Sequence, residues 1–350
     1  MTIKQKIIKS SIIFSIMLAL AAMCLFYDFF NPLIVNGLLN RFDLVSRNEN
    51  LLVHFIDVGQ GDAIAINLPD GKTMLIDNGT KETNVSCVNY IKENVLNSKT
   101  NKEIDYLVLT HADSDHIGGT MKILKNFDIN LVFMPKTMSD SQTFKEIFNF
   151  VDKNCNYKML GDEFEIATKK YRFTFFEILN DENTNDSSQI IKLEYMRKSF
   201  LFTGDISSEI ETTYVLTYGE ELNSDVLKIS HHGSKTATSA QFLDCVTPQY
   251  AVISVGENND YNRPHEEVLN ILNINNVEIK RTDKHGDILF VVGNDYDLKV
   301  LNGNFYITNL SLNYTIYIVV LDIILIINIV IICVKKDKKN KKLKRKTVVK

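Results

Sequence analysis

Two histidines and two aspartates stand within six positions of the stretch LTHADSDHIGG, residues 109–119. His111, Asp113, Asp115 and His116 follow an apolar run that predicts a strand, and two glycines come directly after them. Imidazole and carboxylate groups held this closely desolvate or repel one another badly without a cation, and together they suit zinc, manganese or iron. One Asp or His in such a turn would be a helix cap or a surface group. Four of them predict a metal site.

Three further stretches carry ligand-type residues at the same kind of place. Asp205 ends the apolar run SFLFTGD, His231 and His232 end DVLKISHHGS, and His265 precedes a helical pattern in NRPHEEVL. Folds of the α/β class place their sites at the carboxyl ends of strands. If these strands align, their side chains meet the first cluster at one rim and supply ligands for two divalent cations bridged by a carboxylate and a water.

The elements that must position these residues form one body, from about residue 51 to about residue 304. Short β-rich runs alternate there with helical ones, without repeats or a long linker, which predicts one α/β domain of about 250 residues. His54 and His285 fall in strand-like or turn contexts and are predicted to serve packing or solvation. The glycine-containing turns GQGD and PDGK join the first three strands. Strands are predicted at 51–58, 63–68, 73–78, 104–110, 172–179, 190–196, 199–205, 225–230 and 250–256, and helices at 85–98, 141–152, 206–218 and 264–274.

Both ends of the chain have the pattern of membrane segments. Residues 10–27 carry no charge, and residues 312–334 carry only Asp322, so each is long enough to cross a bilayer. Lysines precede the first segment and a basic tail at 335–350 follows the second, which predicts both termini in the cytoplasm and the body outside. We expect an uncleaved anchor within residues 1–30; a cleaved signal peptide is the alternative.

The formal net charge of −4 hides an uneven distribution. Without the three N-terminal lysines and the tail's ten basic residues and one aspartate, 26 basic and 42 acidic residues remain, a charge near −16. Such a body counts against tight binding of a polyanion, unless metal ions and a local basic patch reverse the sign where it matters.

The cysteines do not predict a metal site or a disulfide framework. Cys87, Cys155 and Cys245 are far apart in the body, and the sequence contains no C-x-x-C motif. One disulfide outside the cell remains an alternative.

In their order, the motifs IDVGQGD, LIDNG, THADSDH, TGD, HHGS and PHEEVL resemble the metallo-β-lactamase superfamily. Within it they are similar to the extracellular hydrolase domain of ComEC-type DNA-uptake proteins. The resemblance spans about residues 51–304 and implies an α/β (α+β) fold, a four-layer αββα sandwich with a two-metal site at one edge. We expect this domain at 48–308, between the two transmembrane helices. ComEC-type proteins also carry a many-helix channel and a small β-barrel domain, so we expect the hydrolase module alone.

The resemblance also implies roles for the ligand-type residues. The superfamily motif H-x-H-x-D-H falls on residues 111–116, with Asp113 where many relatives have histidine. Asp205 is then the bridging carboxylate, and His231, His232 and His265 complete the ligation or contact the substrate. Which of these three histidines are direct ligands stays open.

Other matched positions are implied to support the site. Asp77 in LIDNG becomes a carboxylate that orients the ligands, and Asp57 and Asp62 in DVGQGD match the opening turn of the family. For that turn, a capped hairpin is an equally good interpretation. Asn185 and Ser188 match the stretch before the bridging strand, where they are expected to face the pocket.

The function implied is a membrane-tethered extracellular hydrolase of the bacterial plasma membrane, with two divalent zinc or manganese ions as cofactors. A hydroxide bridging the metals would cleave a phosphodiester, with Asp115, Asp205 and His232 as catalytic residues. DNA or another phosphodiester polymer is the expected substrate, and competence or channel proteins are the expected partners. One alternative is an esterase of cell-wall choline-phosphate, which suits the acidic body. Another is a metal-stabilised binding module without activity. Lactam hydrolysis is disfavoured because that branch usually keeps histidine where this chain has Asp113.

Overall fold

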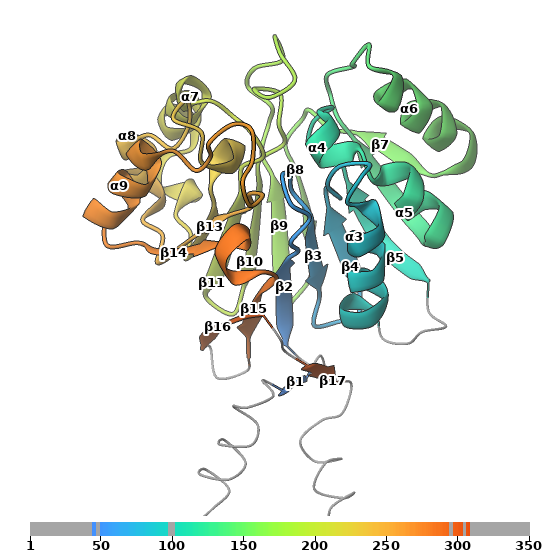
Figure 1. Ribbon diagram of the computed structural model, residues 1–350, viewed down its shortest axis with the longest axis horizontal. Coiled ribbons are helices and arrows are strands. Elements are labelled where there is room, and N and C mark those ends of the chain that lie inside the picture. Colours follow the sequence, from blue (N-terminus) through green and yellow to red (C-terminus); the bar gives the residue numbers. More distant parts are fainter. Residues whose placement is uncertain (1–43, 47–49, 97–101, 294–296, 304–305, 309–350) are drawn as a thin grey trace, which may run out of the picture.

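Two mixed β-sheets pack face to face in the protein, and helices cover the outer face of each (Figure 1). The computed structural model describes residues 44–46, 50–96, 102–293, 297–303 and 306–308. The predicted αββα sandwich is confirmed for this part of the chain. The predicted segments 1–30 and 312–334 and the basic tail 335–350 lie outside the described residues. No helix within the described ranges has the length and apolar character to span a bilayer.

The first sheet begins with an antiparallel meander and continues with parallel crossovers. Its strand order is β16-β15-β2-β3-β4-β5-β6-β7, and neighbours from β4 to β7 are parallel. Its strands are β2 (Leu51–Phe55), β3 (Ile64–Asn67), β4 (Thr73–Ile76), β5 (Glu103–Val108), β6 (Asp128–Met134), β7 (Tyr157–Met159), β15 (Ile288–Val292) and β16 (Leu298–Asn302).

The second sheet repeats this plan in the other half of the sequence. Its order is β14-β13-β12-β11-β10-β9-β8, with parallel neighbours from β11 to β14. Its strands are β8 (Phe164–Ala167), β9 (Tyr171–Phe175), β10 (Ile191–Tyr195), β11 (Lys198–Phe202), β12 (Val226–Lys228), β13 (Tyr250–Ile253) and β14 (Glu278–Arg281).

The covering helices pack apolar side chains against the sheets, and α6 has the clearest apolar stripe. In α6, Phe144, Ile147 and Val151 recur at helical spacing and are buried, and Ser141 caps the helix by accepting from the Phe144 N–H. Over the first sheet lie α3 (Asn84–Tyr90) with its extension η2 (Ile91–Val95), α4 (Ser114–Ile117), α5 (Thr120–Asn126) and α6 (Gln142–Asn154). Over the second lie α7 (Ser208–Tyr218), η3 (Gly219–Leu222), α8 (Ala240–Val246) and α9 (Glu266–Ile274). The short turns η4 (Ser230–Gly233) and α10 (Thr282–His285) complete the helical segments.

The alternation of side chains along β2 shows how the layers are filled. Leu51, Val53 and Phe55 point between the sheets, where aromatic side chains from β9, β11 and β15 pack against them. Each such buried side chain contributes about 1.5–3 kcal/mol. His54 points the other way and hydrogen-bonds Tyr90 in α3 at 2.9 Å, which is the packing role expected for it.

The parallel strands of both sheets run toward one rim of the sandwich. The turns after β4, β5, β11 and β12 all lie there, at the top of Figure 1. At the opposite end, β1 (Leu44–Ser46) and β17 (Tyr306–Thr308) pair in parallel (Figure 1). The rim therefore faces away from the place where the described chain begins and ends.

Candidate metal centre

Four side chains with metal-ligating atoms meet at the rim. Asp62, His116, Asp205 and His232 are buried, and one ligand atom from each lies within 4.8 Å of the others. Asp62 precedes β3, His116 lies in α4, Asp205 follows β11, and His232 lies in η4 after β12. Both sheets thus contribute, as their shared rim requires. The sequence predicted three of these as ligands and Asp62 as an orienting carboxylate.

A carboxylate behind His116 fixes the orientation of its ring. The Nδ1–H of His116 donates to Asp77 Oδ2 at 2.8 Å, which leaves Nε2 facing Asp205 Oδ1 at 3.2 Å. Asp77 itself accepts from the Thr110 N–H at 2.9 Å and from the Thr110 hydroxyl at 2.7 Å. A ligating histidine held by a carboxylate in this way keeps its other nitrogen free for a metal.

His232 is oriented by a backbone carbonyl. Its Nδ1–H donates to the Ser254 carbonyl at 2.8 Å. Its Nε2 then lies 3.3 Å from Asp115 Oδ2 and 3.4 Å from Asp205 Oδ2. Asp205 therefore stands between the two imidazoles, with one oxygen toward each.

An unusual backbone turn aims this histidine. His231, His232 and Gly233 all have left-handed φ angles, of 51°, 55° and 79°. Such angles cost a non-glycine residue of order 1–3 kcal/mol and persist where the surrounding structure holds them. A Cβ on Gly233 would lie 2.6 Å from Pro264 Cβ, so only glycine fits there. Beside the turn, His231 Nε2 accepts a hydrogen bond from Arg263 at 2.8 Å.

The donor set fits a divalent cation. Among the described residues, five buried atoms at the centre have no hydrogen-bond partner: Asp62 Oδ1, His111 Nε2, His116 Nε2, Asp205 Oδ1 and His232 Nε2. The contact between His116 and Asp205 is close but lacks hydrogen-bond geometry. Each unpaired buried polar atom costs about 1–3 kcal/mol. Imidazole nitrogens and carboxylate oxygens left free in this way are the ligands that zinc, manganese and iron use.

The close approach of carboxylates and imidazoles also sets the protonation of the cluster. Burial lowers the pKa of His116, but the carboxylates of Asp205 and Asp77 outweigh it and hold that pKa well above its usual value. Burial likewise opposes charge on His232, yet Asp205 and Asp115 raise its pKa to about 9. Against its own burial, Asp205 has its pKa held well below the usual range by His232 and His116. In the metal-free chain, protons on these imidazoles supply the positive charge that a bound cation would replace.

A buried lysine stands in the same cluster. Lys228 ends β12, and its Nζ lies 2.5 Å from Asp62 Oδ2 and 3.8 Å from Asp205 Oδ1. The ammonium also donates to the Gly204 carbonyl at 3.3 Å. Its side chain is fully buried, so the ion pair with Asp62 is shielded from water. The sequence analysis did not predict a role for this residue. Lys228 lies on the same face of β12 as Val226, and it is the one polar residue of that strand.

The remaining predicted site residues lie around the cluster. His111 is buried with its ring centroid 4.1 Å from that of His116, and Asp115 is partly exposed beside His232. Ser188 accepts from the Asp205 N–H at 3.0 Å, while the side-chain oxygen of Asn185 is buried without a partner among the described residues.

Three further predicted residues also lie outside the four-residue cluster and have other contacts or positions in the structure. Asp113 is the N-cap of α4, and His265 is the N-cap of α9, where its Nδ1 accepts from the Lys235 N–H at 3.3 Å. Asp57 is exposed and accepts from the Gly59 N–H at 3.0 Å. The ligand roles of Asp113 and His265 stay predictions, as does the orienting role of Asp57.

Comparison with known proteins places this geometry in a family. The family model described as "Metallo-beta-lactamase superfamily" matches residues 56–257, which contain most of the site described above. The chain belongs to the metallo-β-lactamase superfamily. The resemblance found in its sequence motifs is confirmed, and its curated relatives include competence proteins of the ComEC type.

Two relatives illustrate the match of this superfamily member. It is 30% identical over 253 residues to ComE operon protein 3 of Bacillus subtilis, covering 68% of this chain and 32% of that protein. It is 28% identical over 253 residues to competence protein ComA of Neisseria gonorrhoeae, covering 72% and 34%. The chain thus spans about a third of the length of these relatives. The solved metallo-β-lactamase fold protein YhfI of Bacillus subtilis is similar with a TM-score of 0.47 and 10% identity, covering 72% of this chain and 100% of that one.

Proposed function

We propose that this superfamily member is a metal-dependent phosphodiesterase or nuclease, tethered to the membrane and acting outside the cell in DNA uptake. The observation that carries the proposal is the buried cluster of Asp62, His116, Asp205 and His232, in which each residue has one ligand-type atom without a hydrogen-bond partner among the described residues. The relatives named as competence proteins support a link to DNA.

Asp62, His116, Asp205 and His232 would hold a divalent cation, and His111 and Asp115 are the nearest candidates for a second one. When bound, such a cation polarises a phosphoryl oxygen and makes a water molecule acidic enough to attack at neutral pH.

The chain's own groups prepare the centre. Asp77 and the Ser254 carbonyl hold the tautomers of His116 and His232, so both Nε2 atoms stay unprotonated once a cation replaces their protons. Lys228 offsets the charge of Asp62. The guanidinium of Arg263, which bonds His231 beside the centre, offers donors to a phosphate oxygen.

Hydrolysis of bis(p-nitrophenyl) phosphate by the full chain in mild detergent, with manganese or zinc, tests the activity. We expect Asp205→Ala and His116→Ala to lose at least about 100-fold in rate, because each removes a residue that would hold the cation on which the stabilisation of developing charge depends. Asp152→Ala is the matched control and keeps the rate, because Asp152 is exposed on α6 and accepts a hydrogen bond from the Tyr157 hydroxyl at 3.0 Å. Equal rates in all forms would leave the metal-stabilised binding module as the function.

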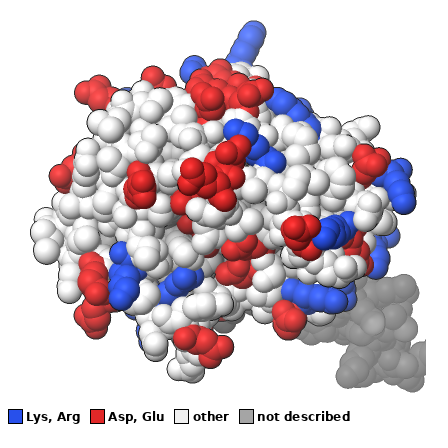
Figure 2. Space-filling model, turned by 90° about the horizontal axis from the view of Figure 1, so that it is seen from above, with Lys and Arg blue, Asp and Glu red and all other residues white. Residues whose placement is uncertain are grey.

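The acidic rim favours a second candidate substrate. Figure 2 views the molecule from the site end, and acidic side chains gather around the middle of that face. A long polyanion is repelled there more than a small substrate. A choline-phosphate ester of the cell wall is therefore the alternative. Parallel assays with single-stranded DNA, duplex DNA and a choline-phosphate polymer separate the two, since the preferred substrate has the highest kcat/KM.

The proposed topology rests on the apolar segments 10–27 and 312–334 and their flanking lysines. Protease added to intact cells should digest the body and spare the basic tail. A digested tail beside a protected body would invert the topology.

A further inference from the structure

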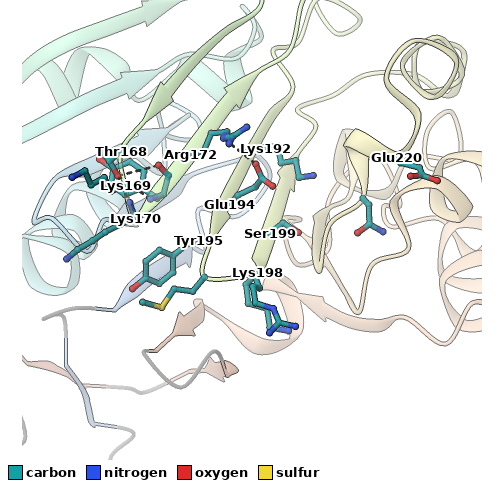
Figure 3. A pocket seen from close by; sticks show the side chains of 14 residues that line it. Thr168, Lys169, Lys170, Arg172, Lys192, Glu194, Tyr195, Lys198, Ser199 and Glu220 are labelled. Carbon is teal, nitrogen blue, oxygen red and sulfur yellow. Dashed lines mark hydrogen bonds and ion pairs between the residues drawn. The ribbon is translucent and has the colours of Figure 1, made fainter.

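An open pocket of about 420 Å³ lies at the end of the second sheet that is remote from the metal centre (Figure 3). The β8–β9 turn, the β10–β11 turn and η3 form its walls. Lys198 opens β11, and Asp205 follows the other end of that strand. Seven residues at about 3.3 Å each put the pocket roughly 23 Å from the metal centre. It is therefore not part of the site described above.

The pocket is strongly basic although the body is acidic. Two of its lining residues are acidic, Glu194 and Glu220, and six are basic, which leaves a charge of +4: Lys169, Lys170, Arg172, Lys192, Arg197 and Lys198. This is the kind of local patch that reverses the sign of a negative protein for an anionic ligand.

About half of this positive charge is compensated within the fold. Lys198 pairs with Asp225 at 3.2 Å, and Arg172 contacts Glu165 at 3.4 Å and Glu194 at 3.9 Å. The Nζ of Lys192 donates to the Glu221 carbonyl at 2.6 Å.

The rest of the charge faces solvent. Within the described ranges, Lys169, Lys170 and Arg197 form no ion pair, and all three are exposed. Met196 and Arg197 form the β10–β11 turn with φ angles of 49° and 67°, where Asn-Gly would be unstrained. Retained strain of this kind is typical of functional positions.

The pocket lies at the end of the molecule where the described chain begins and ends. Strands β2 and β11 both run toward the rim, so their first residues, Leu51 and Lys198, lie at the opposite end. There β1 and β17 also lie, at the lower end of Figure 1. The described chain begins and ends here, and in the sequence it is flanked by the two apolar stretches 10–27 and 312–334.

We propose that this basic pocket binds the phosphate groups of anionic lipids and so docks the domain on the membrane with its metal centre pointing away from the surface. The inference rests on the proposed membrane anchoring and not on the proposed hydrolase activity. Each Lys or Arg near an anionic bilayer strengthens the attraction by roughly fivefold, within a distance of about 10 Å. DNA bound here would lie far from the metal centre, so a lipid surface is the better occupant.

Hydrogen–deuterium exchange of the full chain in nanodiscs tests the docking. We expect amides of 168–172 and 195–199 to exchange more slowly in discs of phosphatidylglycerol than in discs of phosphatidylcholine, and the difference to vanish in 1 M salt. Residues 57–62 at the rim should exchange equally in both. The triple variant Lys169→Gln, Lys170→Gln, Arg197→Gln should weaken docking on the order of 100-fold and abolish the protection.

Two variants distinguish lipid docking at this pocket from the proposed hydrolase activity and from a general effect of surface charge. Lys122→Gln with Lys125→Gln, two exposed cations of α5, is the matched control and keeps the protection. Asp205→Ala also keeps it, whereas the triple variant keeps hydrolysis of bis(p-nitrophenyl) phosphate. A chain that fails to incorporate into discs refutes the anchoring itself.

The remaining outcomes overturn the docking. These are equal protection in both discs, absence of protection in either, or the same protection in phosphatidylcholine discs with 10 mM inorganic phosphate or with a DNA duplex. The last two would assign the pocket to soluble phosphate or to nucleic acid.

Discussion

Replacing Lys228 by methionine would remove the ammonium from the centre of the site and keep most of the side-chain volume. Its partner Asp62 Oδ2 lies 2.5 Å away, and the two side chains are 0% and 3% exposed. A buried carboxylate stripped of its partner costs about 3–5 kcal/mol. At roughly 2–4 °C per kcal/mol for a domain of this size, we expect the Tm of the chelated protein to fall by about 10 °C. Urea unfolding in mild detergent with EDTA, followed by circular dichroism, gives the free energy of unfolding.

The chain contains a matched ion pair that should behave differently. Lys198 lies 3.2 Å from Asp225, but these side chains are 24% and 26% exposed, so Lys198→Met should cost less than about 1 kcal/mol. Adding Asp62→Asn to Lys228→Met should recover at least about 2 kcal/mol of the loss, because the stranded charge is gone. When metal is present instead of EDTA, Lys228→Met should also lose less free energy of unfolding. Equal losses for Lys228→Met and Lys198→Met in EDTA would refute this reasoning.

Three more predictions concern other carboxylates of the domain. Asp77→Asn should weaken metal affinity about 10–100-fold with the fold intact, because the His116 ring loses its carboxylate; metal titration with circular dichroism measures both. Glu211 accepts two backbone N–H groups at 2.7 Å each, so Glu211→Gln, which turns one acceptor into a donor, should cost about 1–3 kcal/mol in urea unfolding at pH 8. Burial, with Asp57 nearby, raises the pKa of Asp287 to about 6. Because this folded-state pKa exceeds the unfolded one, protonated Asp287 favours the fold at low pH and the benefit is lost as pH rises through 6. Asp287→Asn should therefore raise Tm most at pH 8, by about half as much at pH 5, and little only below about pH 4, near the unfolded-state pKa of 3.8.

The strand ends that carry the site could be predicted because the local pattern and the chemistry agree there. The run 104–110 predicted a buried strand, and β5 spans Glu103–Val108 with His111 just beyond it. The same holds for Asp205 after β11 and for His232 after β12. An apolar run followed by ligand-type residues at a glycine-containing turn shows both the strand and the ligands at its end within about ten residues.

Features that depend on distant parts of the chain were missed. Asp62 joins the cluster because the turn before it packs against α4, where a Cβ on Gly61 would lie 2.1 Å from the Asp115 carbonyl. Lys228 is buried because Asp62, far away in the sequence, neutralises it. Strand β15 inserts beside β2 only in the assembled sheet. Strand β6 was also missed, although the alternation in DINLVFM was a usable signal for it.

The pairing of β1 with β17 has a consequence for how this domain combines with others. Leu44 and Tyr306 face each other across adjacent parallel strands, so the first and last described strands are about 4.8 Å apart. A unit whose two ends meet this closely can be spliced into a single surface loop of a host protein without stretching it. Gene fusion could therefore transfer the whole sandwich between unrelated host proteins in one step, with its metal-binding edge undisturbed.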